Sequence, residues 1–403
     1  MDDAKKLKKI EFKVSAPGRI ILSGEPSMMY GGNVVSASID LRTTLKFCEI
    51  TDNRKNIIEI DFPDIDLYLN LSLEHVLNFF LYNNNNNANL FIEEYIMLLI
   101  HVQYFITVNG MWSTYEQRFS LQTFFFLFIY TILNEELSAK SFHVCLTSQL
   151  PMRAGLGSST SFATCLAACF LHWARLQEGI DEFSDEDLEQ ISDRVWYCEE
   201  ILQNYVSNID NEVCSYGKII RFRHGNRTDP NFKRFLNVSK IKILLIDSRI
   251  RQNKFEQVKR LAEMKFSNST ILNMILNNIN YISEEVSNTL TNIDYIQKIN
   301  FPTKQLELQN AYETLKHFVL LHQLYFCFLK LSHPNIDMIC DIVKEYGFAG
   351  KITNFGGRYV CILLPPDAID EDVMMLSAHL MSLGYYATKT SMSCSGVRID
   401  NSY

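Results

Sequence analysis

Residues 150–168 read LPMRAGLGSSTSFATCLAA, and they join a predicted strand to a predicted helix that begins near Ser159. Gly155 and Gly157 allow the backbone to approach a ligand closely, and the serines and threonine that follow supply hydroxyl donors and a helix N-cap. The N–H groups and the dipole at a helix start favour a bound anion, for which phosphate is the natural candidate. Taken alone, the pattern equally suits a capped helix start that binds nothing.

Two common nucleotide motifs are excluded by the same residues. No lysine follows a second glycine in the order that a P-loop requires, and Thr160 stands where a dinucleotide fingerprint has its third glycine. A phosphate site in this segment is therefore of another kind.

A second cluster comprises Glu199, on a predicted helix over residues 188–204, and Asp210 with Asn211, which open the next helical turn. A magnesium ion bound with ATP takes only one or two protein carboxylates, so one glutamate and one serine hydroxyl would suffice. A separate aspartate could then accept the proton of an attacking hydroxyl. Spacing alone favours the alternative, in which Glu199 is a solvated helix residue and Asp210 is a helix cap.

Two further segments place a cation beside glycine. Residues 15–19, SAPGR, predict a turn that delivers Arg19 into a strand, either as an active-site cation or as a structural ion-pair partner, for example of Glu25. Residues 353–358, TNFGGR, are typical of a hairpin turn between two strands.

Strand and helix patterns alternate along both halves of the chain, which predicts an α+β or α/β fold. The main strand patterns cover residues 19–22, 34–47, 142–146, 240–247 and 359–364, and the main helical ones 91–133, 159–176, 305–331 and 370–383. We expect residues 305–331 to form the longest helix. A polar stretch over residues 225–235 predicts a boundary between domains over residues 1–235 and 236–403, and the asparagine run 83–87 predicts an exposed loop.

Composition limits the classes of function. The chain has 403 residues, 47% of them apolar, and its 38 basic and 46 acidic side chains give a net charge of −8. Because no basic stripe is present, binding to nucleic acid or to an anionic membrane surface is not expected. The ten cysteines form no CxxC pair, and the N-terminal residues lack the apolar core of a secretory signal, so we expect a reducing compartment, the cytoplasm.

Two apolar stretches could suggest a membrane helix. Residues 123–133 are much shorter than the roughly 20 residues that a spanning helix needs, and residues 90–108 contain two glutamates, a histidine and a glutamine. We therefore expect both to be buried helices of a large core, and no membrane partner.

Five segments, taken together in their order along the chain, carry a resemblance to a known family. They read APGRIILSGEPSMMYGGNVVSASIDLRTTL (16–45), LPMRAGLGSSTSFATCLAA (150–168), NYVSNIDNEVCSYGKIIRF (204–222), LSHPNIDMICDIV (331–343) and TSMSCSGVRI (390–399). Together they resemble the GHMP kinases, the superfamily of galactokinase, homoserine kinase and mevalonate kinase, and within it they are most similar to the mevalonate kinases. The resemblance covers nearly the whole chain.

The resemblance implies a role for individual residues. Asp210 falls on the catalytic aspartate, which takes the proton of the substrate hydroxyl as it attacks the γ-phosphate of ATP, and Arg19 falls on an active-site cation. Ser159 and Glu199 fall on the Mg²⁺ ligands. The implied nucleotide contacts are Ser148, Arg153, Ala154, Gly155, Leu156, Gly157, Ser158 and Ser159.

The resemblance also implies a fold and a reaction. The fold is of the α+β class, with an N-terminal ribosomal-protein-S5-like α/β domain, a C-terminal ferredoxin-like α+β domain and the active site in the cleft between them. The reaction is the ATP- and Mg²⁺-dependent phosphorylation of mevalonate to 5-phosphomevalonate, in the synthesis of isoprenoid precursors. Because the family is often dimeric, a homodimer is an expectation as well.

The chain departs from the pattern of the mevalonate kinases at three places. Arg19 stands where they carry lysine, Pro26 where they carry histidine, and the third glycine-rich motif is reduced to residues 354–358. In that motif Phe355 and Arg358 add side chains beside the expected phosphate site, although Arg358 could offer compensating charge. The alternatives are therefore a GHMP kinase with another hydroxylated substrate and a nucleotide-binding protein with weak catalysis.

Overall fold

The computed structural model describes residues 9–51, 56–82, 92–135, 137–203, 209–223, 232–250, 252–299 and 302–400. Twelve strands are formed within these ranges: β1 (Glu11–Ser23), β2 (Val34–Glu49), β3 (Ile57–Phe62), β4 (Leu67–Ser72), β5 (Phe142–Ser148), β6 (Ile219–Phe222), β7 (Lys233–Leu236), β8 (Ile241–Asp247), β9 (Ala349–Ile352), β10 (Tyr359–Leu363), β11 (Tyr386–Met392) and β12 (Arg398–Asp400). The helices of the same ranges are α1 (Glu25–Met28), α2 (Leu73–Leu77), α3 (Ile92–Val108), α4 (Tyr115–Asn134), α5 (Ser158–Glu178), α6 (Asp185–Gln203), α7 (Asp210–Tyr216), α8 (Lys254–Ser267), α9 (Ser269–Lys298), α10 (Lys304–Phe328), α11 (Pro334–Glu345) and α12 (Asp370–Ser382), with short η turns at Pro63–Ile65 and Asn78–Tyr82.

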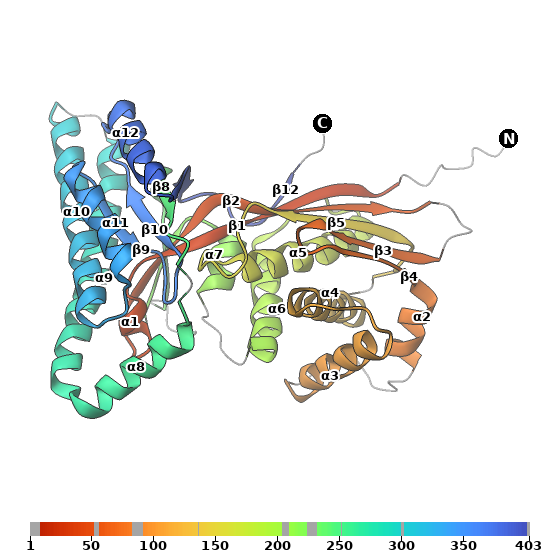
Figure 1. Cartoon of the computed structure of the whole chain (residues 1–403). Helices are drawn as coiled ribbons and strands as arrows, with labels where there is room; N and C mark the ends of the chain where they lie inside the picture. Colours follow the sequence, from red (N-terminus) through yellow and green to blue (C-terminus); the bar gives the residue numbers. More distant parts are fainter. Residues whose placement is uncertain are drawn as a thin grey trace.

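One mixed sheet connects the two halves of the chain. Its main path runs β4–β3–β5–β2–β11–β8–β10–β9, and β1, β12, β6 and β7 join it beside β2. The long strands β1 and β2 cross the whole molecule in Figure 1, with α2 to α6 below one end of the sheet and α9 to α12 packed at the other. The sheet therefore carries residues from both halves of the sequence to the region where the two helical layers meet.

β1 passes through the segment that the sequence predicts as a turn. Residues 15–19 lie inside this strand, which pairs with β2 along its length, so the predicted turn is wrong. The register of the pair shifts between Pro17 and Gly18. Proline has no N–H to donate to the ladder, which is why such residues are found at bulges, and the chain therefore kinks here without leaving the sheet.

Several elements differ from the sequence-based expectation. The longest described helix is α9, with 30 residues, rather than the predicted helix over residues 305–331, which forms α10. β3 and β4 were not predicted, although both alternate apolar and polar residues. Part of the expected boundary stretch forms β7, which pairs with β6, so the boundary after residue 235 stays a prediction. The asparagine run 83–87 lies outside the described residues.

The apolar stretch over residues 123–133 forms most of α4, as expected for a core helix. The side chains of Phe124, Phe125, Phe126 and Phe128 are fully buried, and Phe124 and Phe128 contact Phe170 of α5. None of the described helices has the length and apolar character that crossing a membrane requires. The stretch is therefore core, and it anchors α5, the helix that follows the glycine-rich loop.

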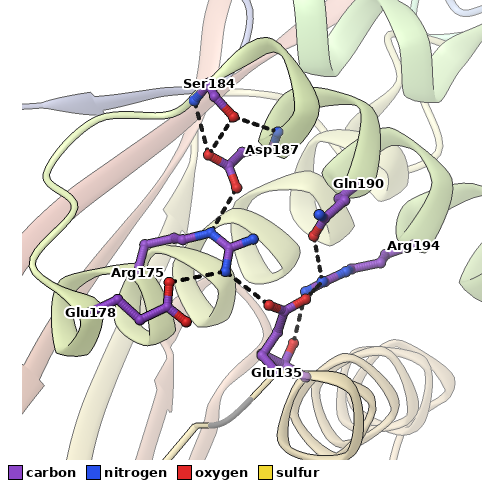
Figure 2. A network of polar contacts seen from close by, with 8 residues as sticks. Glu135, Arg175, Glu178, Ser184, Asp187, Gln190 and Arg194 are labelled. Atoms are coloured by element: carbon purple, nitrogen blue, oxygen red, sulfur yellow. Dashed lines mark hydrogen bonds and ion pairs between the residues drawn. The ribbon is translucent and has the colours of Figure 1, made fainter.

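A polar network fixes α4, α5 and α6 relative to one another (Figure 2). Glu135, just after α4, accepts hydrogen bonds from Arg175 of α5, at 2.9 Å, and from Arg194 of α6. Arg175 also donates to Asp187 near the start of α6, at 2.9 Å. Because the arginines and carboxylates are mostly buried, each charge needs its partner. The network thereby sets the position of α6, which carries Glu199, against the end of α5.

We predict that Glu135→Gln lowers the free energy of unfolding by roughly 3 kcal/mol, because it leaves two buried guanidinium groups without their shared carboxylate. Urea unfolding followed by circular dichroism measures the change. Glu178→Gln is the matched control: Glu178 bonds the same Arg175 at 3.4 Å but its side chain is 47% exposed, so a loss of at most about 0.5 kcal/mol is expected. Equal losses in the two variants would contradict this ranking.

Candidate active site

A cavity of about 1010 Å³ opens where the two halves of the chain meet. Its walls come from the middle of β1, residues 62–65, the start of α4, the loop over residues 148–157, the starts of α5, α7 and α8, the end of α6 and the loop over residues 354–356. Ligand pockets for small molecules and cofactors typically measure about 300–1000 Å³, so this cavity has room for a nucleotide together with a small acceptor.

Arg19 reaches the cavity from β1, next to the bulge. A side chain at Gly18 would lie 2.5 Å from the Leu150 side chain and 2.8 Å from the carbonyl oxygen of Leu156, so only glycine allows this loop to pack on the strand. The N–H of Arg19 donates to the same Leu156 oxygen at 2.9 Å. The glycine-rich loop is therefore fastened to the strand at the residue that carries the cation.

The loop before α5 leaves the helix start uncapped. Arg153, Gly155 and Gly157 have positive φ angles, and Gly157 is the N-cap, with no side-chain hydrogen bond to the helix. The expectation that the serine and threonine run provides the N-cap is therefore wrong. The first N–H groups of a helix have no intrahelical partner. Because no side chain of the described residues caps them, they can serve an anion in the cavity.

The loop over residues 353–358 packs against the first glycine-rich loop. A Cβ at Gly155 would lie 3.0 Å from the Cα of Gly357, and the N–H of Arg358 donates to the carbonyl oxygen of Ala154 at 3.2 Å. Two segments some 200 residues apart therefore form one backbone surface, and glycine is required on both sides of it.

Phe355 and Arg358, the two side chains expected beside the phosphate site, have different surroundings in the structure. Arg358 is not among the described residues that line the cavity, and its guanidinium forms an ion pair with Asp247 of β8. The expectation that Arg358 supplies compensating charge is therefore wrong. Phe355 lines the cavity but is only 4% exposed, and its ring packs against Phe326 of α10, with centroids 5.8 Å apart.

Arg19 and Asp210 form an ion pair at the floor of the cavity. One terminal nitrogen of Arg19 donates to Oδ2 of Asp210, and the other donates to the carbonyl oxygen of Gly155 at 3.0 Å. Burial opposes the charge of Arg19, but the Asp210 carboxylate raises the pKa of the guanidinium above its ordinary value. Within the described part of the chain, Oδ1 of Asp210 is buried and has no hydrogen-bond partner, so its capacity to accept a hydrogen bond is unused.

α7 holds Asp210 in place. Asp210 is the first residue of this helix, and the neighbouring Asn211 is fully buried. The Asn211 side chain donates to the hydroxyl oxygen of Ser192 at 2.9 Å and to its carbonyl oxygen at 3.1 Å. α7 is thereby tied to α6, the helix that carries Glu199.

Glu199 is buried, with 6% of its surface exposed, so the interpretation as a solvated helix residue is wrong. Thr160 of α5 donates its hydroxyl to both carboxylate oxygens, at 2.9 and 3.0 Å. Burial and the nearby charge of Asp210 raise the pKa of Glu199 to about 7, although the hydroxyls of Thr160 and Ser159 and the charge of Arg19 act in the opposite direction. A divalent cation beside Glu199 would relieve the cost of its buried charge.

The structure brings most of the candidate site residues to one place. Those that line the cavity are Arg19, Ser148, Arg153, Gly155, Gly157, Ser158, Ser159, Glu199 and Asp210. Ala154 and Leu156 instead point into the core, and they act through the backbone oxygens that hold Arg358 and Arg19. Ser148 is also tied into the fold, because its N–H donates to Asp64 at 2.7 Å and its hydroxyl lies 2.9 Å from that of Thr43.

Glu25, considered above as a partner for Arg19, lies elsewhere. Gly24 has a φ of 102° and turns the chain at the end of β1. Glu25 therefore faces Lys351 of β9, whose Nζ lies 2.8 Å away, and His322 of α10, whose Nε2 lies 3.1 Å away. All three side chains are buried, so the predicted ion pair between Arg19 and Glu25 is wrong.

Two residues that contribute to the site were not predicted. Thr160 was expected as one of the hydroxyl donors of the glycine-rich segment but not as a partner of Glu199, to which it donates. Lys254, the first residue of α8, lines the cavity from the second half of the chain. Its sequence context, QNKFEQ, contains no motif, and only the packing of α8 against the loop over residues 354–356 indicates that it belongs to the site.

Comparison with known proteins adds an independent finding. A family model for the GHMP kinases N-terminal domain matches residues 125–217. The mevalonate kinases of Gibberella zeae and Bos taurus are 27% and 26% identical to the chain; each match covers 96% of this chain and respectively 77% and 94% of the relative. The resemblance to the GHMP kinases is confirmed.

The fold of the GHMP kinases is confirmed as well. A crystal structure of L. major mevalonate kinase in complex with R-mevalonate superposes with a TM-score of 0.64 at 13% identity, over 96% of this chain and 98% of that one. At this identity the likeness shows the fold alone, and it supports the predicted α+β class. The relatives that match by sequence over nearly the whole chain agree with the prediction of a kinase.

We predict that Glu199→Gln changes how stability depends on pH. Because burial raises the pKa of Glu199 to about 7, from about 4.5 in the unfolded chain, the folded state binds the extra proton between these values. The protonated carboxyl makes its full contribution to the free energy of unfolding below about pH 4.5. This contribution is lost as the pH rises through 7. In metal-free buffer, the free energy of unfolding of the wild type should fall by up to roughly 3 kcal/mol relative to that of Glu199→Gln between pH 5 and 8. Urea unfolding measures this change. Parallel pH curves would contradict the shift.

Proposed function

We propose that the chain is a mevalonate kinase, which transfers the γ-phosphoryl group of ATP to the primary hydroxyl of mevalonate and releases 5-phosphomevalonate and ADP. The observation that carries the proposal is the Arg19–Asp210 pair, with Oδ1 of Asp210 without a partner among the described residues, in the same cavity as the start of α5 and Glu199. Phosphoryl transfer needs little covalent chemistry from a protein, and it depends mostly on positioning and on compensation of negative charge.

The cavity suits the phosphates of ATP. Backbone at Gly155 and Gly157 lies against Gly357 and Arg19, without room for side chains. The start of α5 presents N–H groups that no side chain caps. These features are the ones by which helix starts bind phosphate groups.

The donors beside α5 suit Mg²⁺. Glu199 and the hydroxyls of Ser159 and Thr160 offer only oxygen ligands, which Mg²⁺ prefers, and Mg²⁺ bound with a nucleotide takes few protein ligands. In the described part of the chain no cluster of three or more His, Cys, Asp or Glu side chains forms a separate metal site. We propose that Ser159 and Glu199 hold the ion. When bound, it would supply positive charge to the phosphate oxygens.

Asp210 and Arg19 perform the chemical step in this proposal. Oδ1 of Asp210 accepts the proton of the acceptor hydroxyl while the hydroxyl oxygen bonds to the γ-phosphorus and the bond to the β-phosphate oxygen breaks. Arg19 holds the other carboxylate oxygen of Asp210, so the carboxylate keeps one orientation. An arginine remains protonated throughout, and its role is therefore electrostatic.

Mevalonate as the acceptor rests on the relatives, whose names identify them as mevalonate kinases. A coupled assay that follows ADP release with mevalonate and ATP tests the assignment directly. Turnover of another hydroxylated acid or sugar, but not of mevalonate, would favour a different GHMP kinase. Nucleotide binding without turnover on any acceptor would favour a protein that has lost catalysis.

We predict that Asp210→Asn lowers kcat by on the order of 10²–10⁴ and leaves nucleotide affinity nearly unchanged, because only proton acceptance is lost. Steady-state kinetics and calorimetric titration with ATP measure the two quantities. Asp40→Asn is the control, since Asp40 pairs with Lys240 at the surface, at 3.2 Å, and should keep wild-type kcat. An unchanged kcat in Asp210→Asn would remove this carboxylate from the mechanism.

We also predict that Ser159→Ala raises the Mg²⁺ concentration needed for half-maximal activity, by about tenfold, because one oxygen ligand is removed. Activity measured against free Mg²⁺ at saturating nucleotide gives this value. Ser377→Ala is a suitable control, because Ser377 lies in α12 and its hydroxyl donates only to the carbonyl oxygen of Val373. A wild-type Mg²⁺ curve for Ser159→Ala would exclude Ser159 as a ligand.

A further inference from the structure

Lys254 occupies the cavity wall that the second half of the chain provides. It begins α8, and the side chain of Asn253 caps the helix by accepting from the N–H of Phe255 at 3.0 Å. A Cβ at Gly356 would lie 3.2 Å from the backbone nitrogen of Lys254. The backbone of Lys254 is thus fixed against the loop over residues 354–356, and its side chain lines the same cavity as Arg19 and Asp210.

The charge of Lys254 interacts with the charged groups of the reaction centre. Burial and the charge of Arg19 lower the pKa of its ammonium group to about 8, although the carboxylates of Asp210 and Glu199 act in the opposite direction. The group is therefore a cation at neutral pH. It is held near the carboxylate that receives the acceptor hydroxyl, and solvent screening there is weaker than at the surface.

The other two cationic side chains of the cavity, Arg19 and Arg153, have their own contacts in the structure. Among the described lining residues, the basic side chains are Arg19, Arg153 and Lys254. Arg19 is committed to Asp210 and to the Gly155 carbonyl. Arg153 belongs to the loop before α5, is 67% exposed, pairs with Glu116 at 3.0 Å and lies over the ring of Tyr115.

Lys254 differs from both arginines in its location. It stands on α8, outside the glycine-rich loop and close enough to Asp210 for their charges to interact. An acceptor whose hydroxyl reaches Asp210 and whose other end carries a carboxylate would bring that anion to this wall. An ammonium group is a compact point charge suited to a single carboxylate.

We propose that Lys254 is a specificity-determining residue that binds the carboxylate of the acceptor and thereby selects hydroxy acids over neutral alcohols and sugars. This inference rests on the proposed function, because it assumes that an acceptor hydroxyl is phosphorylated at Asp210. A neutral acceptor would take up the same space without an anion for the ammonium group, and its binding would lack the charge-assisted hydrogen bond.

The test compares two substitutions on two acceptors, with the full chain. Lys254→Met removes the charge at similar length, and Lys254→Arg keeps it. The acceptors are mevalonate and the neutral triol in which the carboxylate is reduced to an alcohol. Lys259→Met is the matched control, because Lys259 lies on the same helix with its side chain 77% exposed.

With mevalonate, we expect Lys254→Met to raise KM by on the order of 10² and to change KM for ATP by less than about threefold. Lys254→Arg should recover most of the loss, and Lys259→Met should behave like the wild type. With the triol, the wild type and Lys254→Met should have equal kcat/KM, since removal of the carboxylate already removes the interaction. Thermal unfolding of each variant verifies that the fold is kept.

The outcomes separate the two proposals. If the wild type does not turn over mevalonate, the proposed function fails and the inference fails with it. If the wild type is active and Lys254→Met keeps its KM for mevalonate, only the inference is overturned. Equal losses on the acid and the triol, or a loss confined to KM for ATP, would also overturn it. Should Lys254→Met not fold, the comparison of Lys254→Gln with Lys254→Arg on the two acceptors decides by the same criteria.

Discussion

The ion pair between Arg19 and Asp210 is the interaction on which the rest of the site depends. It joins β1 to α7 through two residues that are 191 positions apart in the sequence, and both side chains are largely buried. Buried charges are stable only when each keeps its partner, so the strand and the helix must hold their relative position. The pair also determines which oxygen of Asp210 keeps its accepting capacity, because Arg19 donates to Oδ2 while Oδ1 has no hydrogen-bond partner among the described residues.

The surroundings of this pair hold it in place through backbone contacts. Because Gly18 has no side chain, Leu150 and Leu156 can pack against the strand. In the same way, Gly155 allows the loop of Gly357 to pack closely. The network around Glu135 then sets α6 against α5. The charged groups of the cavity therefore rest on a rigid frame, as preorganised electrostatic stabilisation requires.

The helical core and the glycine-rich helix start could be predicted from the sequence, because both depend on local patterns. The burial of α4 follows from an apolar run too short for a membrane, and α5 follows from its alanine- and leucine-rich stretch. The partners of charged residues could not be predicted in this way. Arg19 has Glu25 as a carboxylate nearby in the sequence, but the turn at Gly24 directs Glu25 to Lys351 and His322. Likewise Arg358 pairs with Asp247, because β8 and β10 are neighbours in the sheet.

By itself the sequence determined the family resemblance and the glycine-rich segment that leads into a helix, since each depends on residue types in a short stretch. Only the tertiary structure decided that Glu199 is buried beside Thr160, that two distant glycine loops form one surface, and that Lys254 shares a cavity with Asp210. The physical reason is that burial and charge pairing depend on contacts between elements far apart in the chain. No local pattern encodes which wall of a cavity a side chain will occupy.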